Sequence, residues 1–495
     1  MRRASLLALV VVAFPSTAFA ATYQVGPDKP YQTIAEIVSD LEPGDVVEVD
    51  GDATYSGDIH VRPDSTGTPD QKITLRGIRK NGKRPVIQGG AEYGIVLHGS
   101  HFVFEGFEVT GASGFCVVHK ADDVTIRDVA VHDCPNHGIL GTDSESGSLT
   151  MEFVEVYACG SDLYEHQVYI ATDESMYPGS VFRLQHSYIH DANGGNNVKS
   201  RAERNEIYSN WIENPYYHVL DLIGPDGQDP GLAREDSDIV GNVLIQRREW
   251  MVARFGGDGT GDTNGRYRFA YNTVILGPDA TGLWLRYGLE SVAVHDNVFL
   301  TEGGSPPLIN DGEAAWTNGP QLSGERNFVQ SGLTAPAFFT GTVTGADPMF
   351  KDMAGGNLVP LEGSPLKDAG APGVGPAGFE IPSPLTVPTT VPPALGVSAD
   401  LTPIARPTDA TPDIGAYEFG TVVTPGTGGS GAGSGSGAGP GSGSGSGGGD
   451  GIGDEDSNGD VEGVACDCRL PGAPTPAAGA SLLALAVLAL LRRRR

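Results

Sequence analysis

A short strand-like motif recurs through the middle of this chain and limits its fold more than any other feature. Each copy ends in an apolar residue, and successive copies lie 22 to 33 residues apart. The closing residues are Val109, Val131, Val156, Ile189, Ile212, Leu244, Val274, Phe299 and Val329. Repeats of this length predict a solenoid, in which each repeat is one coil and buries its apolar face against its neighbours.

The last five copies of the motif carry an asparagine two residues before the closing residue. These are Asn210, Asn242, Asn272, Asn297 and Asn327. In stacked coils such asparagines come into register, so each side-chain amide can bond its neighbour and the backbone of a turn. An asparagine ladder of this kind predicts a parallel β-helix. A two-sheet sandwich, the alternative all-β fold, would show hairpin turns such as Asn-Gly at short spacing.

Both ends of the repeat region contain segments typical of one fold family. The start carries a short amphipathic helix predicted at Ile34 to Leu41, then Pro43-Gly44-Asp45 and an apolar strand from Val46 to Val49. It resembles the capping start of secreted right-handed parallel β-helices of the pectin-lyase type. The phrases DPMF, GSPLKDAG and PDIGAYEF resemble the ends of such proteins. We therefore expect an all-β, right-handed parallel β-helix over residues 21–346, with final coils and a cap over 347–419.

The two chain termini predict export. Residues 1–20 contain Arg2 and Arg3, an apolar stretch and a small-residue cleavage site, which is the pattern of a secretory signal peptide. Residues 420–464 are rich in Gly, Ser and Asp and predict a flexible linker.

Residues 465–495 contain Cys466 and Cys468, an apolar run from Ala477 to Leu491 and four terminal arginines. This tail resembles the myxobacteria-type C-terminal sorting signal (MYXO-CTERM). The resemblance implies a membrane helix and a sorting protease that acts near the cysteines, so the protein would be tethered to the cell envelope or outer surface, or released from it. An ordinary tail anchor is the alternative.

Charge and cysteine content restrict the partners. The formal net charge is −30, which argues against nucleic-acid binding because phosphate recognition needs a basic surface. Cys134 and Cys159 occupy equivalent repeat positions, so we predict that they pair across neighbouring coils, with stacked free thiols as the alternative. The cysteine spacing fits no zinc site. We expect a monomer.

A second strand follows each motif by about ten residues and carries the candidate chemistry. Alternation predicts one outward side chain per coil. The predicted outward residues are His119, Tyr169, Lys199, Asp221, Arg254 and Arg286. Arg201 faces the same way as Lys199, and His166 and His218 lie near the starts of their strands. Asp221 between Lys199 and Arg254 allows a plain ion-pair ladder. A groove for an acidic polysaccharide is the other interpretation, with arginine bound to carboxylates.

These residue types suit β-elimination of a polyuronate. Lys199 is the candidate base, because neighbouring arginines lower a lysine pKa. Arg201 or Arg254 would neutralise the substrate carboxylate, and Tyr169 or His166 would protonate the leaving oxygen. The candidate substrate-binding residues are His119, His218, Asp221, Arg286 and Trp284. No cofactor is required, although Asp221 with Asn197 is a candidate Ca²⁺ site.

The segment GGNNVKSRAERNEIYSNWI resembles a recurring part of secreted β-helix proteins that are distant relatives of alginate- and chondroitin-type lyases. In those lyases a lysine and an arginine on neighbouring coils are base and acid. Lys199 matches the lysine, but the next coil carries Asp221, and an arginine follows only at Arg254. The resemblance implies a polysaccharide lyase-like protein that cleaves or binds acidic polysaccharide. A non-catalytic glycan-binding or adhesion protein is the alternative.

Overall fold

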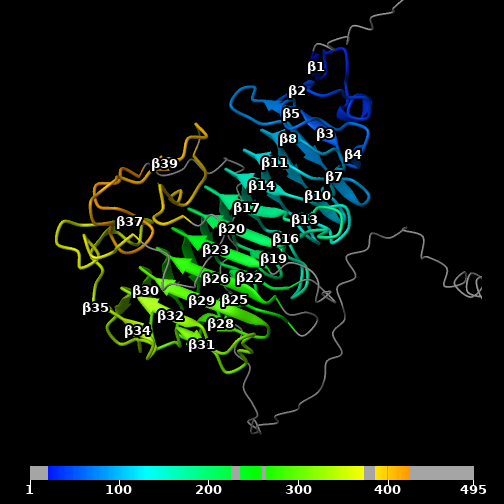
Figure 1. Ribbon diagram of the computed structural model, residues 1–495. Coiled ribbons are helices and arrows are strands. Elements are labelled where there is room, and N and C mark those ends of the chain that lie inside the picture. Colours follow the sequence, from blue (N-terminus) through cyan, green and yellow to red (C-terminus); the bar gives the residue numbers. More distant parts are fainter. Residues whose placement is uncertain (1–19, 225–234, 259–262, 373–384, 399, 424–495) are drawn as a thin grey trace, which may run out of the picture. The chain divides into compact units, whose positions relative to one another are not determined.

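Three long parallel sheets form the fold (Figure 1). The computed structural model describes residues 20–224, 235–258, 263–372, 385–398 and 400–423. Residues 1–19 of the signal peptide, residues 424–464 of the linker and the whole sorting tail with Cys466 and Cys468 thus lie outside the described residues. Within the described part, no helix is long and apolar enough to cross a membrane.

Each complete coil adds one strand to each sheet, so the strands that are neighbours in a sheet come from successive coils. One coil, for example, runs through β20 (Arg204–Tyr208), β21 (Trp211–Glu213) and β22 (Leu220–Leu222) before β23 (Asp236–Val240) pairs with β20. Parallel strands joined by crossovers of this kind wind right-handed. The predicted right-handed parallel β-helix is confirmed.

Within the described residues, the three sheets contain 13, 12 and 10 strands. Sheet A contains β1 (Thr22–Val25), β2 (Val46–Asp50), β5 (Ile73–Ile78), β8 (Phe102–Glu105), β11 (Val124–Arg127), β14 (Leu149–Glu152), β17 (Val181–Gln185), β20, β23, β26 (Gly265–Ala270), β29 (Leu289–His295), β32 (Leu322–Glu325) and β34 (Phe339–Thr340). Sheet B contains β3 (Thr54–Ser56), β6 (Val86–Gln88), β9 (Glu108–Thr110), β12 (Ala130–His132), β15 (Glu155–Tyr157), β18 (Tyr188–His190), β21, β24 (Val243–Gln246), β27 (Thr273–Leu276), β30 (Val298–Thr301), β33 (Phe328–Gln330) and β35 (Val343–Gly345). Sheet C contains β4 (Ile59–Val61), β7 (Tyr93–Leu97), β10 (Phe115–His119), β13 (Ile139–Gly141), β16 (Val168–Ala171), β19 (Val198–Arg201), β22, β25 (Met251–Phe255), β28 (Thr281–Leu285) and β31 (Ile309–Asn310).

The nine closing residues of the sequence motif form one column inside sheet B. Val109, Val131 and Val156 are paired in register, and the pairing continues without a gap to Val329. All nine belong to the main hydrophobic core. The period read from the sequence is therefore the period of the coils.

The asparagine ladder lies at the turn between sheets A and B and is confirmed. Nδ2 of Asn210 donates to Oδ1 of Asn242 at 3.0 Å, and Asn242 donates to Asn272 at 2.9 Å. Each of these acceptor oxygens also receives the backbone N–H of the preceding rung, as from Asn210 at 2.9 Å. The remaining rungs, Asn297 and Asn327, repeat the pattern.

The N-terminal helix is shorter than predicted. The structure has a 3₁₀ helix, η1 (Ile34–Glu36), in place of a helix from Ile34 to Leu41. Runs of 3₁₀ helix longer than about one turn are uncommon, and no side chain caps this one. The following strand, β2, agrees with the prediction.

The segment expected to supply further coils takes a different course. After β35 the chain forms two antiparallel pairs, β36 (Phe350–Asp352) with β37 (Asn357–Pro360) and β38 (Thr390–Val391) with β39 (Ile404–Ala405). These elements return along the outside of sheet B (Figure 1). The outer face of sheet B is apolar in these coils, and the returning segment buries it. The apolar residues brought together are Trp211, Val243, Ile275, Val298, Leu358, Val359 and Val391.

The disulfide differs from the predicted one. Cys116 pairs with Cys134 at a Cα–Cα distance of 5.9 Å, and Cys159 is a buried free thiol. Cys134 and Cys159 do occupy equivalent places, two residues after His132 and Tyr157, which are paired in register. Equivalent positions in stacked coils point their Cβ atoms in the same direction, whereas a disulfide needs Cβ atoms that converge. Cys116, at the start of β10, meets that condition.

Candidate functional site

One outward column of sheet C carries most of the polar residues predicted from the sequence. Tyr169 (β16), Lys199 (β19), Asp221 (β22), Arg254 (β25) and Trp284 (β28) are paired in register across five successive strands. Apart from Ser200, which is also buried, their neighbours along each strand belong to the hydrophobic core, so alternation turns these five side chains away from it. Adjacent members are about 4.8 Å apart along the sheet.

Two residues predicted for this column lie elsewhere. His119 pairs with Gly141 and continues the inward column of Leu97 and Ile170, and it is 0% exposed. Arg286 lies two residues beyond Trp284 and forms an ion pair with Glu313 at 2.7 Å. The error at His119 is a shift of one residue, which turns its side chain to the opposite face of the sheet. Arg286 was placed two residues too far along, beyond the end of β28 (Thr281–Leu285), where Trp284 takes its position in the column.

Lys199 occupies the middle of the column without an ionic partner among the described residues. It is 7% exposed, and its Nζ lies 4.7 Å from the centre of the Tyr169 ring. No hydrogen bond or ion pair joins Nζ to any residue in the described part of the chain. Burial lowers the pKa of the Lys199 ammonium, and the charge of Arg201 lowers it further. The proton on Lys199 is therefore easier to lose than that of an ordinary lysine.

Asp221 is paired with Arg254 instead of Lys199. Arg254 Nε and Nη2 donate to the two carboxylate oxygens at 2.6 and 2.7 Å, and Asn196 Nδ2 donates to Oδ2 at 3.0 Å. Burial alone would raise the pKa of Asp221, but Arg254 holds it below the usual value. The ion-pair ladder expected across three coils is thus limited to one pair.

Arg201 joins the column from its sheet A side. Its Nε donates to the Tyr169 hydroxyl at 3.1 Å, and Nη2 forms an ion pair with Asp258 at 2.6 Å. Nη1 donates to the Gly224 carbonyl. The guanidinium therefore fixes the Tyr169 hydroxyl and places a positive charge beside it.

A second ladder runs beside the column, at the turn between sheets B and C. The acceptor atoms are His137 Nδ1, His166 Nδ1, Asn196 Oδ1 and His218 Nδ1, and each receives the backbone N–H of the next coil at 2.8, 3.0, 3.0 and 3.2 Å respectively. We call these four residues the histidine ladder. Because Nδ1 accepts, each neutral imidazole must carry its proton on Nε2.

The imidazoles of this ladder are neutral. Burial lowers the pKa of His137 and of His218 to about 3, and lowers that of His166 well below its usual value, with Lys199 adding to the effect at His166 and His137. His166 therefore holds no imidazolium proton to give to a leaving oxygen near neutral pH. Its Nε2–H is a hydrogen-bond donor, with no partner among the described residues.

The predicted calcium pair does not converge. Asn197 faces away from Asp221: its Oδ1 accepts from Gln167 at 2.9 Å and its Nδ2 donates to the Glu213 carbonyl at 2.8 Å. The adjacent Asn196 is the residue that reaches Asp221. Over the ranges that the structure describes, no group of three or more His, Cys, Asp or Glu side chains is arranged to hold a metal ion.

Aromatic rings gather at the C-terminal end of the column. Tyr217 stacks on His218 with centroids 3.8 Å apart and meets Trp250 edge-on at 4.5 Å. Trp284 lies under the Arg286 guanidinium at 4.4 Å. Partly exposed rings beside charged groups suit contact with the faces of sugar rings.

Sequence reasoning missed His137, Asn196, Tyr217, Trp250 and Asp258. A signal existed for the histidine ladder, because each of its members lies two residues before the first strand residue of sheet C, as His166 lies before Val168. Aligning the coils on those strands exposes the column of His, His, Asn and His. Asp258 has no such signal, since its contact with Arg201 spans 57 residues.

No protein-family model matches this chain, and no curated protein matches it in sequence. Several solved structures are similar in fold. Pectate lyase Pel9A is similar over 81% of this chain and 97% of its own, with 14% identity and a TM-score of 0.46. An alginate lyase from Paenibacillus sp. str. FPU-7 is similar over 66% and 95%, with 14% identity and a TM-score of 0.33. A GH136 lacto-N-biosidase from Eubacterium ramulus is similar over 61% and 68%, with 14% identity and a TM-score of 0.38. At these identities the likeness concerns the fold.

Proposed function

We propose that this protein is a polysaccharide lyase that cleaves an acidic polysaccharide by β-elimination, with Lys199 as the base. The observation that carries the proposal is the state of Lys199: buried, unpaired with any described carboxylate, and lowered in pKa by burial and Arg201. A lysine held for structure alone would be expected to pair with a carboxylate such as Asp221. A buried group with a perturbed pKa in a cluster of polar residues is typical of catalytic sites.

The reaction uses three groups of the column. Neutral Lys199 Nζ removes the C5 proton of a uronate unit and becomes an ammonium. The electron pair left on C5 forms the C4=C5 double bond as the C4–O4 bond breaks. Tyr169 gives its hydroxyl proton to O4, and Arg201 Nε, already 3.1 Å from that hydroxyl, stabilises the phenolate that remains.

Arg254 is the candidate ligand for the substrate carboxylate. Its Nε and Nη2 are bound to Asp221, while Nη1 has no partner among the described residues. A hydrogen bond from Nη1 would withdraw charge from the carboxylate and make the C5 proton more acidic. Asp221 then holds the guanidinium in place, so it is a positioning residue.

The test is a product assay on the purified full chain. Alginate, pectate, chondroitin and hyaluronan are supplied in turn, with and without Ca²⁺, and the ultraviolet absorbance of the unsaturated uronate is followed. We expect Lys199→Ala to lower the rate about 10²- to 10⁴-fold. Lys120→Ala is the matched control, because Lys120 also follows a sheet C strand but is paired with Glu145 at 2.8 Å. A flat trace with wild-type protein on every polymer would overturn the proposal.

Glycan binding without turnover is the second candidate function. The observation that favours it is that both arginines of the site already bind carboxylates, Arg254 with Asp221 and Arg201 with Asp258. An acidic polymer would then meet one free lysine in place of a basic groove. Retention of wild-type protein on one of the four polymers, with no absorbance change, would establish this function.

We also propose that the protein is exported and tethered to the cell envelope or outer surface. Support comes from the sequence of residues 1–20 and of 465–495 alone. Cell fractionation of a producing strain tests the proposal, with Cys466→Ser and Cys468→Ser as variants that should alter processing of the tail. Equal amounts of unprocessed protein in the cytoplasm for wild type and both variants would contradict it.

A further inference from the structure

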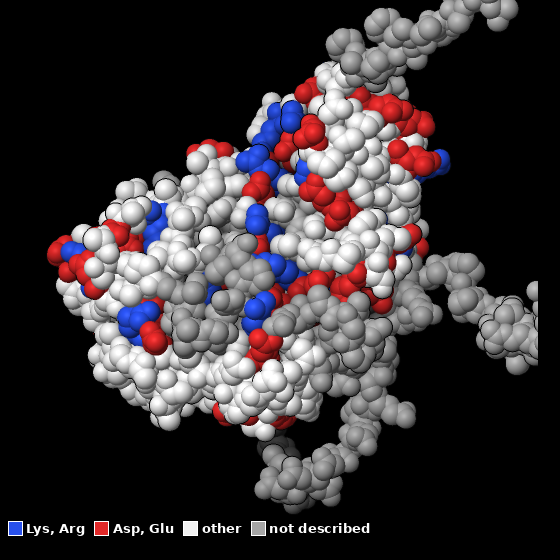
Figure 2. Space-filling model, viewed as in Figure 1, with Lys and Arg blue, Asp and Glu red and all other residues white. Residues whose placement is uncertain are grey.

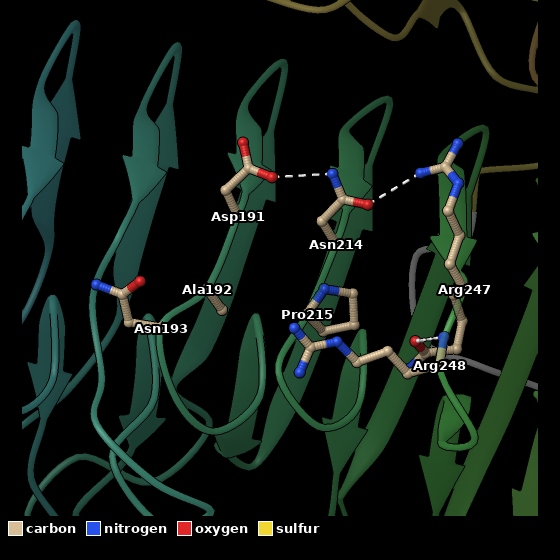
Figure 3. A pocket seen from close by; sticks show the side chains of 8 residues that line it. Asp191, Ala192, Asn193, Asn214, Pro215, Arg247 and Arg248 are labelled. Atoms are coloured by element: carbon tan, nitrogen blue, oxygen red, sulfur yellow. Dashed lines mark hydrogen bonds between the residues drawn. The ribbon is translucent and has the colours of Figure 1, made fainter. Parts of the chain in front are cut away.

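A polar cavity of about 340 Å³ lies at the turns that lead from sheet B into sheet C (Figure 3). Three successive coils contribute to it, through Asp191 to Asn193, Asn214 with Pro215, and Gln246 to Arg248. The same three turns continue into Asn196, His218 and Met251 of the site. The cavity and the column are therefore built on the same coils.

One wall of the cavity is fixed by its own hydrogen bonds. Asn214 Nδ2 donates to Asp191 Oδ1 at 2.9 Å, and Arg247 Nη1 donates to Asn214 Oδ1 at 2.9 Å, as the dashed lines of Figure 3 show. Arg247 also binds Glu302 at 3.1 Å. The Arg247 guanidinium is thus neutralised by Glu302, and Asp191, Asn214 and Arg247 form one hydrogen-bonded edge.

Arg248 differs from the rest of the wall because no described carboxylate neutralises it. In Figure 3 its side chain lies alongside Pro215. The guanidinium lies 5.2 Å from the centre of the Tyr216 ring, and the backbone N–H of Arg248 donates to Gln246 Oε1 at 3.0 Å. Within the placed part of the chain, the other polar contact of its side chain is a hydrogen bond of 3.4 Å from Nη1 to the Tyr216 carbonyl. Most of its donors are therefore open to a ligand.

An unpaired cation is uncommon in the described part of this protein. On the face shown in Figure 2, many Lys and Arg side chains lie beside Asp or Glu side chains. In sheet A, for example, Arg183 pairs with Glu206 and Arg266 with Asp236. Among the residues whose placement is described, the cations with no carboxylate within 4.0 Å are Lys29, Arg62, Lys199, Arg248 and Lys351. Two of these five belong to the column or the cavity. Lys199 lies in β19 of sheet C, and Arg248 lies in the turn between β24 of sheet B and β25 of sheet C.

Aromatic rings lie near both Lys199 and Arg248 in this region. Tyr217 and Trp250 follow Tyr216 and Arg248 in the chain by one and two residues, and their centroids are 4.5 Å apart. Both are partly exposed, and both contact the His218 ring beside the column, with centroids 3.8 and 6.1 Å from it. A sugar chain that leaves the column at His218 meets these rings before it reaches the cavity.

We infer that this cavity is an accessory subsite for a second acidic unit of the same polymer, with Arg248 as the ligand of its carboxylate. The inference takes the class of polymer from the proposed function, and it does not require that the protein cleaves that polymer. Arg248 supplies the charge and a planar pair of donors, while Pro215 and the Tyr216 ring limit its position. A polymer that occupies the column and the cavity together is held across Lys199. The protein should therefore bind long chains more tightly than short ones.

The test measures binding and turnover separately. The full chain carrying Lys199→Ala is run by affinity electrophoresis in gels containing alginate, pectate, chondroitin or hyaluronan, and the polymer that retards it most is used for comparison. Addition of Arg248→Gln should weaken retardation about tenfold, the loss of one charge-assisted contact. Arg62→Gln, which removes another exposed and unpaired arginine at the far end of sheet C, should change nothing. Arg248→Lys, which keeps the charge but loses the planar fork, should fall between.

The outcomes separate the subsite from the function. Equal retardation of Arg248→Gln and Arg62→Gln overturns the subsite, whatever the protein does at Lys199. Retardation of no variant by any of the four polymers overturns the proposed substrate class and the subsite together. If wild-type protein turns over, Arg248→Gln should raise KM for the polymer and leave kcat unchanged. A fall in kcat with KM unchanged would contradict the subsite.

Discussion

The asparagine ladder and the histidine ladder are both built from side chains that accept a backbone N–H from a neighbouring coil, but they differ in what their remaining donors bind. In the asparagine ladder the amide of Asn242 also donates, to Asn272 Oδ1 at 2.9 Å and to the Ile207 carbonyl at 2.8 Å. In the histidine ladder the one remaining donor, Nε2–H, has no described partner at His166 or His218. The amides of the asparagine ladder therefore find partners within the ladder and the nearby backbone, whereas the histidine ladder leaves N–H donors without a described partner beside Lys199.

The difference lies in the side chains. A primary amide has an acceptor oxygen and two N–H donors on a short stem, so both neighbours and the local backbone can be served. An imidazole has one acceptor and one donor on opposite sides of its ring, so using Nδ1 for the coil forces Nε2–H away from the coil. The imidazoles of this ladder therefore join neighbouring coils and leave buried Nε2–H donors at His166 and His218 with no partner among the described residues.

Removal of Asp221 should have the largest effect on stability. Asp221→Ala leaves the Arg254 guanidinium buried without its partner and removes the hydrogen bond from Asn196 of the histidine ladder. We expect a loss of about 3–5 kcal/mol in the free energy of unfolding. Urea denaturation followed by circular dichroism measures it, and Glu105→Ala, which breaks the exposed pair with Arg76, serves as control with a loss of about 1 kcal/mol or less. Equal losses would show that the site pair is not buried as described.

Interruption of the asparagine ladder should have the next largest effect. Asn242→Ala removes the acceptor for the Asn210 N–H and amide, and it removes the amide that donates to Asn272 Oδ1 and to the Ile207 carbonyl. We expect a loss of about 2–4 kcal/mol, because several buried polar groups become unsatisfied. Activity or polymer binding of the folded protein should not change, in contrast with Asp221→Ala. The control is Asn81→Ala at an exposed turn, for which the midpoint of urea denaturation should hardly move.

The pH dependence should separate the two ladders. His137 and His218 have folded-state pKa values of about 3 against about 6.5 when unfolded, so the unfolded chain binds the extra protons. The stability they contribute is complete above pH 6.5 and is lost as the pH falls toward 3, by up to about 1.4 kcal/mol per pH unit for each residue. Denaturation between pH 7.5 and 4.5 measures the slope.

His218→Asn sharpens that comparison. Asn196 shows that an asparagine can serve as a rung of this ladder, so the variant keeps an acceptor and removes one titrating group. Its slope below pH 6.5 should be shallower than that of wild type by the share of one histidine. Asn242→Ala, in the ladder that does not titrate, should keep the wild-type slope. An unchanged slope in His218→Asn would show that this imidazole is not held neutral.

The smallest effect is expected at Cys159, next to the turn that carries the histidine ladder. Burial raises the pKa of its thiol to about 12, so it stays a thiol and takes no part in exchange. Cys159→Ser keeps a donor for the Tyr157 carbonyl, 3.3 Å from the sulfur, and should cost about 1 kcal/mol or less. Peptide mapping without reduction should still find Cys116 joined to Cys134. Recovery of a Cys134–Cys159 peptide from wild-type protein would contradict the pairing.

The sequence predicted the parts of the fold that repeat. The closing residues from Val109 to Val329 and the five asparagines are periodic, so a pattern in one dimension is enough to place them in columns. Lys199, Tyr169, Asp221 and Arg254 were found for the same reason. His119 and Arg286 were misplaced because the turns differ in length between coils, so the strand register cannot be counted from the previous motif. The course of residues 347–419 was missed because it depends on the apolar outer face of sheet B.

The sequence by itself determined the period, the columns and the kinds of side chain available to the site, because stacking converts spacing along the chain directly into neighbours in space. Only the tertiary structure decided the partners. Asp221 binds Arg254 in place of Lys199, Arg201 reaches Asp258 across 57 residues, and Cys134 joins Cys116. These choices depend on side-chain direction and burial at contacts within and between coils. They leave Lys199 with a lowered pKa and no ionic partner among the residues that the structure places.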